Sequence, residues 1–257
     1  MYSSLESLVR TLHITAAAAL LGVAAVTTPA NAQTPPADPH TVEADPATVR
    51  YGTVDVDGVS VFYREAGDPS RSAVLLLHGF PTSSQMFSEL IPKLSDRYYV
   101  LAPDYPGYGL SDQPSREDFT YSFDNMARIV RAVLDHKGVD RFAVYLMDYG
   151  APVGFRLFAE RPEAVTAFVV QNGNAYEEGL TEFWAPLRKY WATNAAEDRN
   201  ALRGFLNLDA TIWQYRHGTR RPDTVNPDNW LIDQPLLDRP GNAEIQLDMF
   251  YDYRTNV

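Results

Sequence analysis

Runs of apolar residues and patterns that repeat every three to four positions alternate along this chain. Residues 73–77, 98–102, 142–147 and 165–170 are mostly apolar and carry no charge, which is typical of strands that a sheet buries on both faces. Residues 53–61 instead alternate about an Asp-Gly pair, the signal of a hairpin turn. We therefore expect one hairpin and four buried strands.

A helical pattern separates the second and third apolar runs, and Gly138 follows it at the position of a helix C-cap. Strands separated by helices predict an α/β fold, a mostly parallel sheet with helices on both faces. In such sheets the chemistry gathers at the carboxyl ends of the strands. The positions that share one face of the predicted helix are Met126, Ile129, Val130, Val133 and Leu134.

The third apolar run ends in a candidate nucleophile. It closes with Leu146-Met147-Asp148-Tyr149-Gly150, and a helical pattern follows at once. A strand, one residue on a sharp turn and a helix form the layout of a nucleophile elbow, here with an aspartate in the nucleophile's place. The alternative is that Asp148 only caps the helix.

The first apolar run ends in His78-Gly79-Phe80-Pro81. Glycine lets the backbone turn toward the elbow, so we expect the amides of Phe80 and Tyr149 to share one oxyanion site. The second run leads into the glycine-rich segment 104–111. Its glycine spacing does not fit a phosphate-binding loop, which leaves a packing role beside the site.

The N-terminal segment has the layout of a secretory signal peptide. Residues 14–28 are uncharged, Arg10 precedes them, and Ala30-Asn31-Ala32 is a small-x-small cleavage site. A membrane anchor is the alternative, but the segment is short for a span of ~20 residues. We expect a signal at residues 1–32, and hence a protein exported to the bacterial periplasm or secreted.

Composition narrows the functional classes. The chain of 257 residues carries 22 basic and 33 acidic side chains, a net charge of −11. Such an acidic chain is a poor partner for nucleic acid or an anionic membrane surface. The absence of cysteine excludes disulfides, thiolate metal sites and a cysteine nucleophile. Neither a metal-ligand cluster nor a nucleotide motif is recognisable, so no cofactor is expected.

Three motifs in order, HGFP, DYPGYGLSDQP and LMDYGAPVGFRL, resemble the α/β-hydrolase superfamily. More narrowly, they are similar to its aspartate-nucleophile branch, the epoxide hydrolases and haloalkane dehalogenases. Beyond the signal at 1–32 and a proline-rich linker at 33–49, the resemblance implies a partial α/β-hydrolase core at 50–175 and a helical cap at 176–257.

The resemblance also implies roles for residues. Asp148 matches the nucleophile that forms an ester with the substrate, and Phe80 and Tyr149 match the oxyanion or halide-facing positions. HGFP is similar to the epoxide hydrolases, whereas Leu146 leans toward the dehalogenases. Tyr149 stands where both groups usually carry tryptophan, which weakens the halide reading. The expected pocket for a small apolar organic substrate comprises His78, Pro81, Trp184, Trp213, Tyr215 and Tyr251.

The branch also uses a histidine and an acid that follow the last strands, beyond the cap. None of the five histidines lies there, and only His217, in the cap, is a remote candidate for the pocket. The resemblance thus implies a chain short of its family by two βα units, or roughly 60 residues. We expect such a chain to form the ester at Asp148 and then stall.

The sequence therefore predicts an epoxide hydrolase-like protein of the aspartate-nucleophile type. Two alternatives remain open. One is a haloalkane dehalogenase-like hydrolase, and the other is a non-catalytic exported protein that keeps the fold for binding. The residues do not predict an oligomeric state.

Overall fold

The computed structural model describes Asp45 and residues 47–257. The predicted signal peptide and most of the predicted linker lie outside these residues. None of the helices in the described part is both long and apolar enough to cross a membrane.

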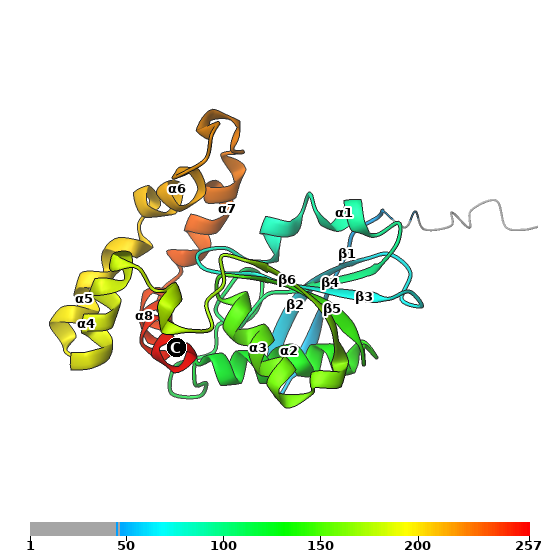
Figure 1. Cartoon of the computed structure of the whole chain (residues 1–257), viewed down its shortest axis with the longest axis horizontal. Helices are drawn as coiled ribbons and strands as arrows, with labels where there is room; N and C mark the ends of the chain where they lie inside the picture. The colour runs from blue at the N-terminus through cyan, green and yellow to red at the C-terminus, as the bar shows by residue number, and fades with distance from the viewer. Residues whose placement is uncertain (1–44, 46) are drawn as a thin grey trace, which may run out of the picture. The chain divides into compact units, whose positions relative to one another are not determined.

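Six strands form one sheet in the order β1-β2-β4-β3-β5-β6 (Figure 1). The first two form the predicted hairpin and pair antiparallel, as do β2 and β4. The remaining pairings are parallel, which confirms the predicted mostly parallel sheet. The strands are β1 (Arg50–Val56), β2 (Val59–Ala66), β3 (Ala73–Leu77), β4 (Tyr99–Pro103), β5 (Phe142–Met147) and β6 (Val165–Gln171).

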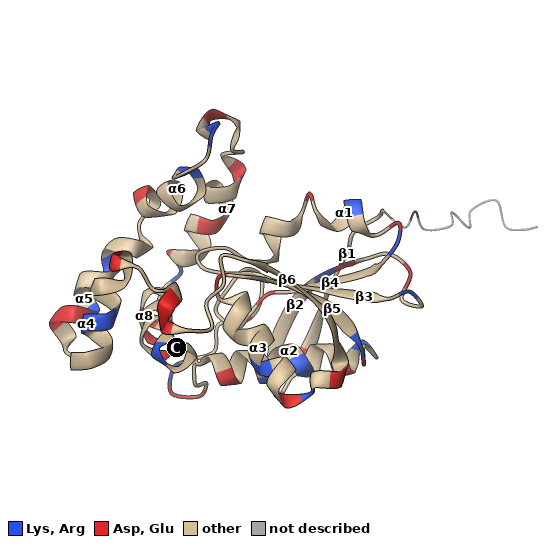
Figure 2. Ribbon diagram, viewed as in Figure 1, with Lys and Arg blue, Asp and Glu red and all other residues tan. Residues whose placement is uncertain are grey.

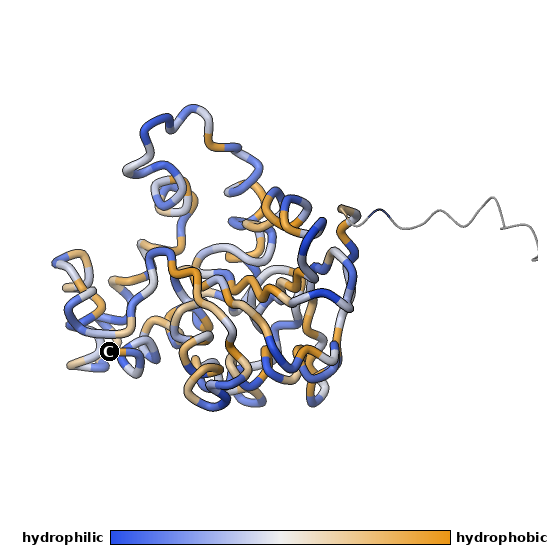
Figure 3. The backbone as a smooth tube through the Cα atoms, turned by 45° about the vertical axis from the view of Figure 1, so that its right-hand side comes forward, coloured by the Kyte–Doolittle hydropathy of each residue, from blue (hydrophilic) through white to orange (hydrophobic). Residues whose placement is uncertain are grey.

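The central strands β3 and β4 are buried on both faces, which explains their continuous apolar runs. Successive side chains of a strand point to opposite faces. Leu75 and Leu77 accordingly join the main core, whereas Leu76 packs in a second cluster with Ile91 of α1. The strands β3 to β6 carry no charged residue, and the charged side chains lie mainly on helices and loops (Figure 2). The apolar positions run through the sheet (Figure 3).

Helix α2 (Phe123–His136) packs beside α3 (Gly150–Glu160) on one face of the sheet, and α1 (Ile91–Leu94) lies on the other (Figure 1). Ser122 caps α2 by accepting from the N–H of Asn125. Gly138, with φ of 66°, ends it in the left-handed conformation. All five residues of the predicted stripe are buried.

Five α-helices follow β6 in the region for which a helical cap is predicted, and we refer to them as the cap. They are α4 (Ala185–Thr193), α5 (Ala196–Ala201), α6 (Leu208–Arg216), α7 (Asp228–Leu237) and α8 (Asn242–Asp252). Single 3₁₀ turns are η1 (Ser84–Phe87), η2 (Pro162–Ala164), η3 (Glu177–Gly179), η4 (Glu182–Trp184), η5 (Leu202–Leu206), η6 (Pro222–Thr224) and η7 (Tyr253–Asn256).

Helix α8 fastens the cap to the core. The amide of Asn242 donates to the carbonyl of Gly107 at 2.6 Å. The Tyr108 hydroxyl donates to Oε1 of Gln246 at 2.7 Å. At the far end of α8, a carboxylate oxygen of Asp252 accepts from the backbone N–H of Phe123, the first residue of α2. The cap's last helix therefore helps to cap a core helix.

Strand β6 lies at the edge of the sheet and pairs only with β5 among the described strands. Its apolar side chains are unusually exposed, with 38% of Phe168, 54% of Val169 and 52% of Val170 accessible. This strand is an open edge in the described part of the chain.

Candidate active site

Asp148 is the first of two residues on the turn between β5 and α3 and has a φ of 51°. Few residues other than glycine, asparagine and aspartate adopt this left-handed conformation. Two close approaches make the turn possible. A Cβ on Gly79 would lie 2.3 Å from Cβ of Asp148, and one on Gly150 would lie 2.4 Å from the carbonyl oxygen of Leu77. Only glycine fits these two positions without displacing the elbow.

A third glycine lies in the helix behind the elbow. A Cβ on Gly154, one turn into α3, would lie 2.1 Å from Cδ2 of the buried Leu146. The large side chain two positions before Asp148 thus occupies the space in which a side chain at 154 would otherwise stand.

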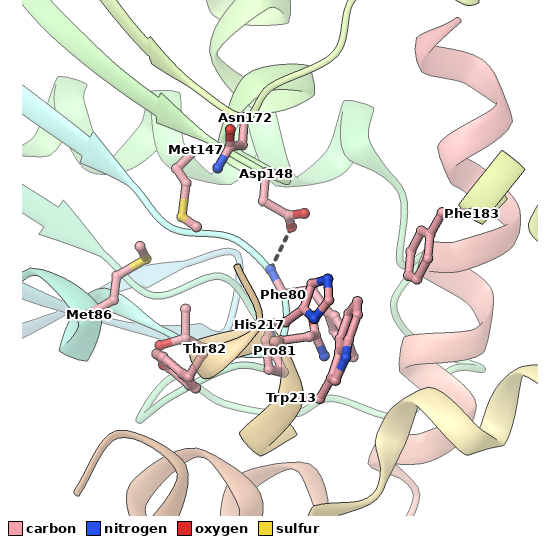
Figure 4. A pocket seen from close by; sticks show the side chains of 12 residues that line it. Phe80, Pro81, Thr82, Met86, Met147, Asp148, Asn172, Phe183, Trp213 and His217 are labelled. Carbon is pink, nitrogen blue, oxygen red and sulfur yellow. Dashed lines mark hydrogen bonds between the residues drawn. The ribbon is translucent and has the colours of Figure 1, made fainter. Parts of the chain in front are cut away.

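The Asp148 carboxylate is held at one oxygen. Oδ1 accepts a hydrogen bond of 2.7 Å from the backbone N–H of Phe80 (Figure 4) and another of 2.7 Å from that of Tyr149. Oδ2 accepts none from the described residues. The two amides expected to share an oxyanion site thus meet at the carboxylate itself. They fix its orientation and leave Oδ2 free of hydrogen bonds from the described residues.

Burial sets the protonation of this carboxyl. Removal from water raises the pKa of Asp148 to about 6, although the two backbone donors act in the opposite direction. The group is therefore mostly ionised at neutral pH.

Two cavities meet at Asp148. The larger has a volume of about 320 Å³ and the smaller about 90 Å³, and Phe80, Phe183 and Gln214 line both. Residues lining only the larger cavity are Pro81, Thr82, Met86, Met147, Asn172, Trp213, Tyr215 and His217 (Figure 4). Residues lining only the smaller are Tyr149, Trp184, Leu187, Phe205, Phe250 and Tyr253.

Two residues expected in the pocket lie outside both cavities. His78 is fully buried, and each of its ring nitrogens meets the backbone. Nε2 accepts from the N–H of Tyr105, which leaves the Nδ1 proton to donate to the carbonyl of Gly79. Burial also lowers the pKa of His78, so the ring is neutral and holds the loop rather than substrate. Tyr251 packs instead against Tyr190, with the Arg254 guanidinium over its ring.

His217 reaches the pocket, although the sequence offers it only as a remote candidate. It follows α6, stacks on Trp213 with ring centroids 4.3 Å apart, and lines the same cavity as Asp148. No ion pair of the described residues involves its imidazole. The fold of the cap, which the sequence does not disclose, brings it there.

Tyr215 lines the larger cavity, but its hydroxyl is engaged. It donates to Oδ2 of Asp233 on α7 at 2.5 Å. Burial raises the pKa of Asp233 to about 6 and holds the pKa of Tyr215 above its ordinary range. The pair lies within the cap and ties α6 to α7.

The glycine-rich segment is structural, as predicted. The buried Asp104 carboxylate accepts from the N–H groups of Ser84 and Leu110. A Cβ on Gly109 would lie 2.0 Å from this carboxylate. Across the described residues, no group of three or more His, Asp or Glu side chains is placed to hold a metal ion.

Comparison with known proteins gives a consistent picture. The family model described as alpha/beta hydrolase fold matches residues 72–224. An uncharacterized hydrolase of Saccharomyces cerevisiae is 43% identical over 205 residues, which cover 78% of this chain and 70% of the yeast protein. Haloalkane dehalogenase 2 of Mycobacterium tuberculosis is 39% identical over 99 residues, 38% of this chain and 34% of the dehalogenase. The solved structure of epoxide hydrolase CorEH covers 80% of this chain and 74% of its own, with a TM-score of 0.63 at 18% identity, which speaks to the fold alone.

Proposed function

This chain belongs to the α/β-hydrolase family, and we propose that it is a hydrolase of the aspartate-nucleophile type with Asp148 as the nucleophile. The observation that carries the proposal is the asymmetric hold on the Asp148 carboxylate. Two backbone N–H groups donate hydrogen bonds to Oδ1, while Oδ2 accepts no hydrogen bond from the described residues. Asp148 lines two cavities.

In the proposed first step, Oδ2 of Asp148 attacks a carbon of the substrate and forms an ester bond. The bond from that carbon to its leaving atom breaks, and the electron pair goes to that atom. The two amides at Oδ1 keep the carboxylate in one orientation, so little rotational freedom is lost when the carbon arrives.

The leaving atom distinguishes two versions of this chemistry. The leading version is opening of an epoxide, because the HGFP segment resembles that of the epoxide hydrolases. The second version is displacement of a halide, which the similarity to the mycobacterial haloalkane dehalogenase supports. The larger cavity, at about 320 Å³, suits a small organic molecule in either case.

The second step, hydrolysis of the ester, needs a base that activates water. Among the described residues His217 is the histidine that lines the cavity, and no carboxylate pairs with its imidazole. We therefore expect this chain to accumulate the ester and release it slowly.

The signal-like segment 1–32 further supports export as a proposal.

Covalent trapping tests the proposed function. The protein is incubated with a small epoxide and, separately, with a small alkyl bromide, and its intact mass is followed. We expect one adduct that maps to Asp148 and is absent from Asp148→Asn. A protein that gains no adduct from either reagent, yet still binds them reversibly in both forms, would instead be a binding protein that keeps the fold.

A further inference from the structure

Helix α6 supplies much of the cap wall opposite Asp148. Trp213, Gln214, Tyr215 and His217 all line the larger cavity, and Gln214 also lines the smaller one. Gln214 therefore stands where the two cavities meet, as Asp148 does on the core side. No other polar side chain of the cap has this position in the described part of the chain.

The side-chain amide nitrogen of Gln214 makes no hydrogen bond with the described residues. This Nε2 atom is buried. An unsatisfied buried donor destabilises a fold, so a persistent one calls for a physical reason. The terminal torsion of glutamine is broad and roughly two-fold, so this amide can reorient when a substrate enters the cavities that it lines.

The neighbouring donor on α6 is not free in this way. Tyr215 has one hydroxyl proton, and that proton is shared with Oδ2 of Asp233 at 2.5 Å. Use of the Tyr215 hydroxyl on a substrate would break a buried hydrogen bond to a carboxylate, whereas use of the Gln214 amide would break none.

We propose that Gln214 is the cap-side hydrogen-bond donor that receives the leaving atom when Asp148 attacks. This proposal rests on the proposed function of Asp148. As the Oδ2–carbon bond forms, negative charge gathers on the leaving atom, and an N–H of Gln214 stabilises that charge more than it stabilises the neutral ground state.

The leaving atom gains negative charge with either substrate. In an alkyl halide this atom is the halogen, and in an epoxide it is the ring oxygen. An amide donates a hydrogen bond but not a proton. A halide departs with its electron pair and needs no proton. An opened epoxide leaves an alkoxide on the adjoining carbon, which takes its proton from water. The two sources therefore call for separate arms of one experiment.

The test measures the single-turnover rate of ester formation with an alkyl bromide in one arm and an epoxide in the other. Gln214→Leu and Gln214→Met remove the donor at nearly constant volume. Gln85→Leu is the matched control, a half-buried glutamine outside both cavities. Thermal melting of each variant verifies that it is folded.

We expect the Gln214 variants to lose about 100-fold in the rate of ester formation, while Gln85→Leu keeps the wild-type rate. A loss in one arm identifies the source of the leaving atom, and a loss in both assigns Gln214 to both. Rates within about two-fold of wild type in both arms would overturn the role of Gln214 and leave Asp148 as the nucleophile. Absence of ester in the wild-type protein overturns the proposed function and this inference with it.

Discussion

A hydrogen bond of 2.7 Å joins the backbone N–H of Phe80 to Oδ1 of Asp148, although 68 positions separate the two residues. The bond connects the loops that follow two neighbouring parallel strands, β3 and β5. It can form only because Gly79 brings the first loop against the second. The geometry of the candidate nucleophile thus depends on a residue that has no side chain.

Replacement of that glycine is the first prediction. In Gly79→Ala the new Cβ would lie 2.3 Å from Cβ of Asp148, so one of the two loops must move. We expect a loss of about 100-fold in the rate of ester formation, the cost of a displacement near 1 Å at a reacting group. Gly204→Ala is the control, because a Cβ at that position would meet no atom within 4 Å and its φ is not positive. Equal rates in both variants would show that the close approach is unimportant.

The second prediction concerns pH. The pKa of Asp148 is raised to about 6, and only the ionised carboxylate is nucleophilic. The single-turnover rate of ester formation should therefore rise between pH 5 and pH 7, with its midpoint near pH 6, and then level off. Quenched reactions followed by intact mass measure this profile. A rate that is flat from pH 4.5 upward would mean that the carboxyl ionises at its ordinary pKa.

The third prediction concerns stability. The burial that raises the pKa of Asp148 should make the folded protein less stable as the pH rises, whereas the rate of ester formation should increase. The folded-state pKa of Asp148, about 6, exceeds the ordinary value of 3.8, so folding favours the protonated form. Stability from this group is present below pH 3.8 and is lost as the pH rises to about 6. Asn at this position removes the charge and tolerates positive φ. We expect Asp148→Asn to be more stable than wild type by about 1–3 kcal/mol at pH 8, with the difference shrinking toward pH 4. Urea denaturation at both pH values provides the comparison.

The fourth prediction is a burst. Because no carboxylate orients His217 among the described residues, ester hydrolysis should be much slower than ester formation. An alkyl bromide should release about one equivalent of bromide per protein, followed by a slow phase, and an epoxide should be consumed in the same two phases. His217→Gln should slow that second phase further if this imidazole supplies the base. Rapid steady turnover that is unchanged in His217→Gln would contradict both expectations.

The sequence is most informative where a pattern is repeated or a turn is constrained. Four apolar runs predict strands within one residue of their observed ends. In β3 and β4, burial on both faces accounts for the run, whereas β6 is also mostly apolar although its side chains are largely exposed. The elbow at Asp148 is recognisable because a strand, a sharp turn and small residues must follow in a fixed order.

The cap wall is less predictable, for a physical reason. Gln214 lies on α6 and His217 directly follows this helix. A single polar residue at such a position looks the same in the sequence whether its side chain faces solvent or substrate. Their position depends on how α6 packs on α7, for example through the bond between Tyr215 and Asp233. His78 shows the converse case, because two backbone partners, invisible in the sequence, remove it from the pocket.

Leu146 and Gly154 are coupled in a way that bears on how this site can change by descent. Their contact leaves no space for a Cβ at 154 while a leucine occupies 146. Glycine within a helix costs about 1 kcal/mol relative to alanine, yet alanine at 154 requires that the buried Leu146 side chain move or become smaller. The order of substitutions at these two positions therefore matters, and the route that first makes residue 146 smaller avoids the clash.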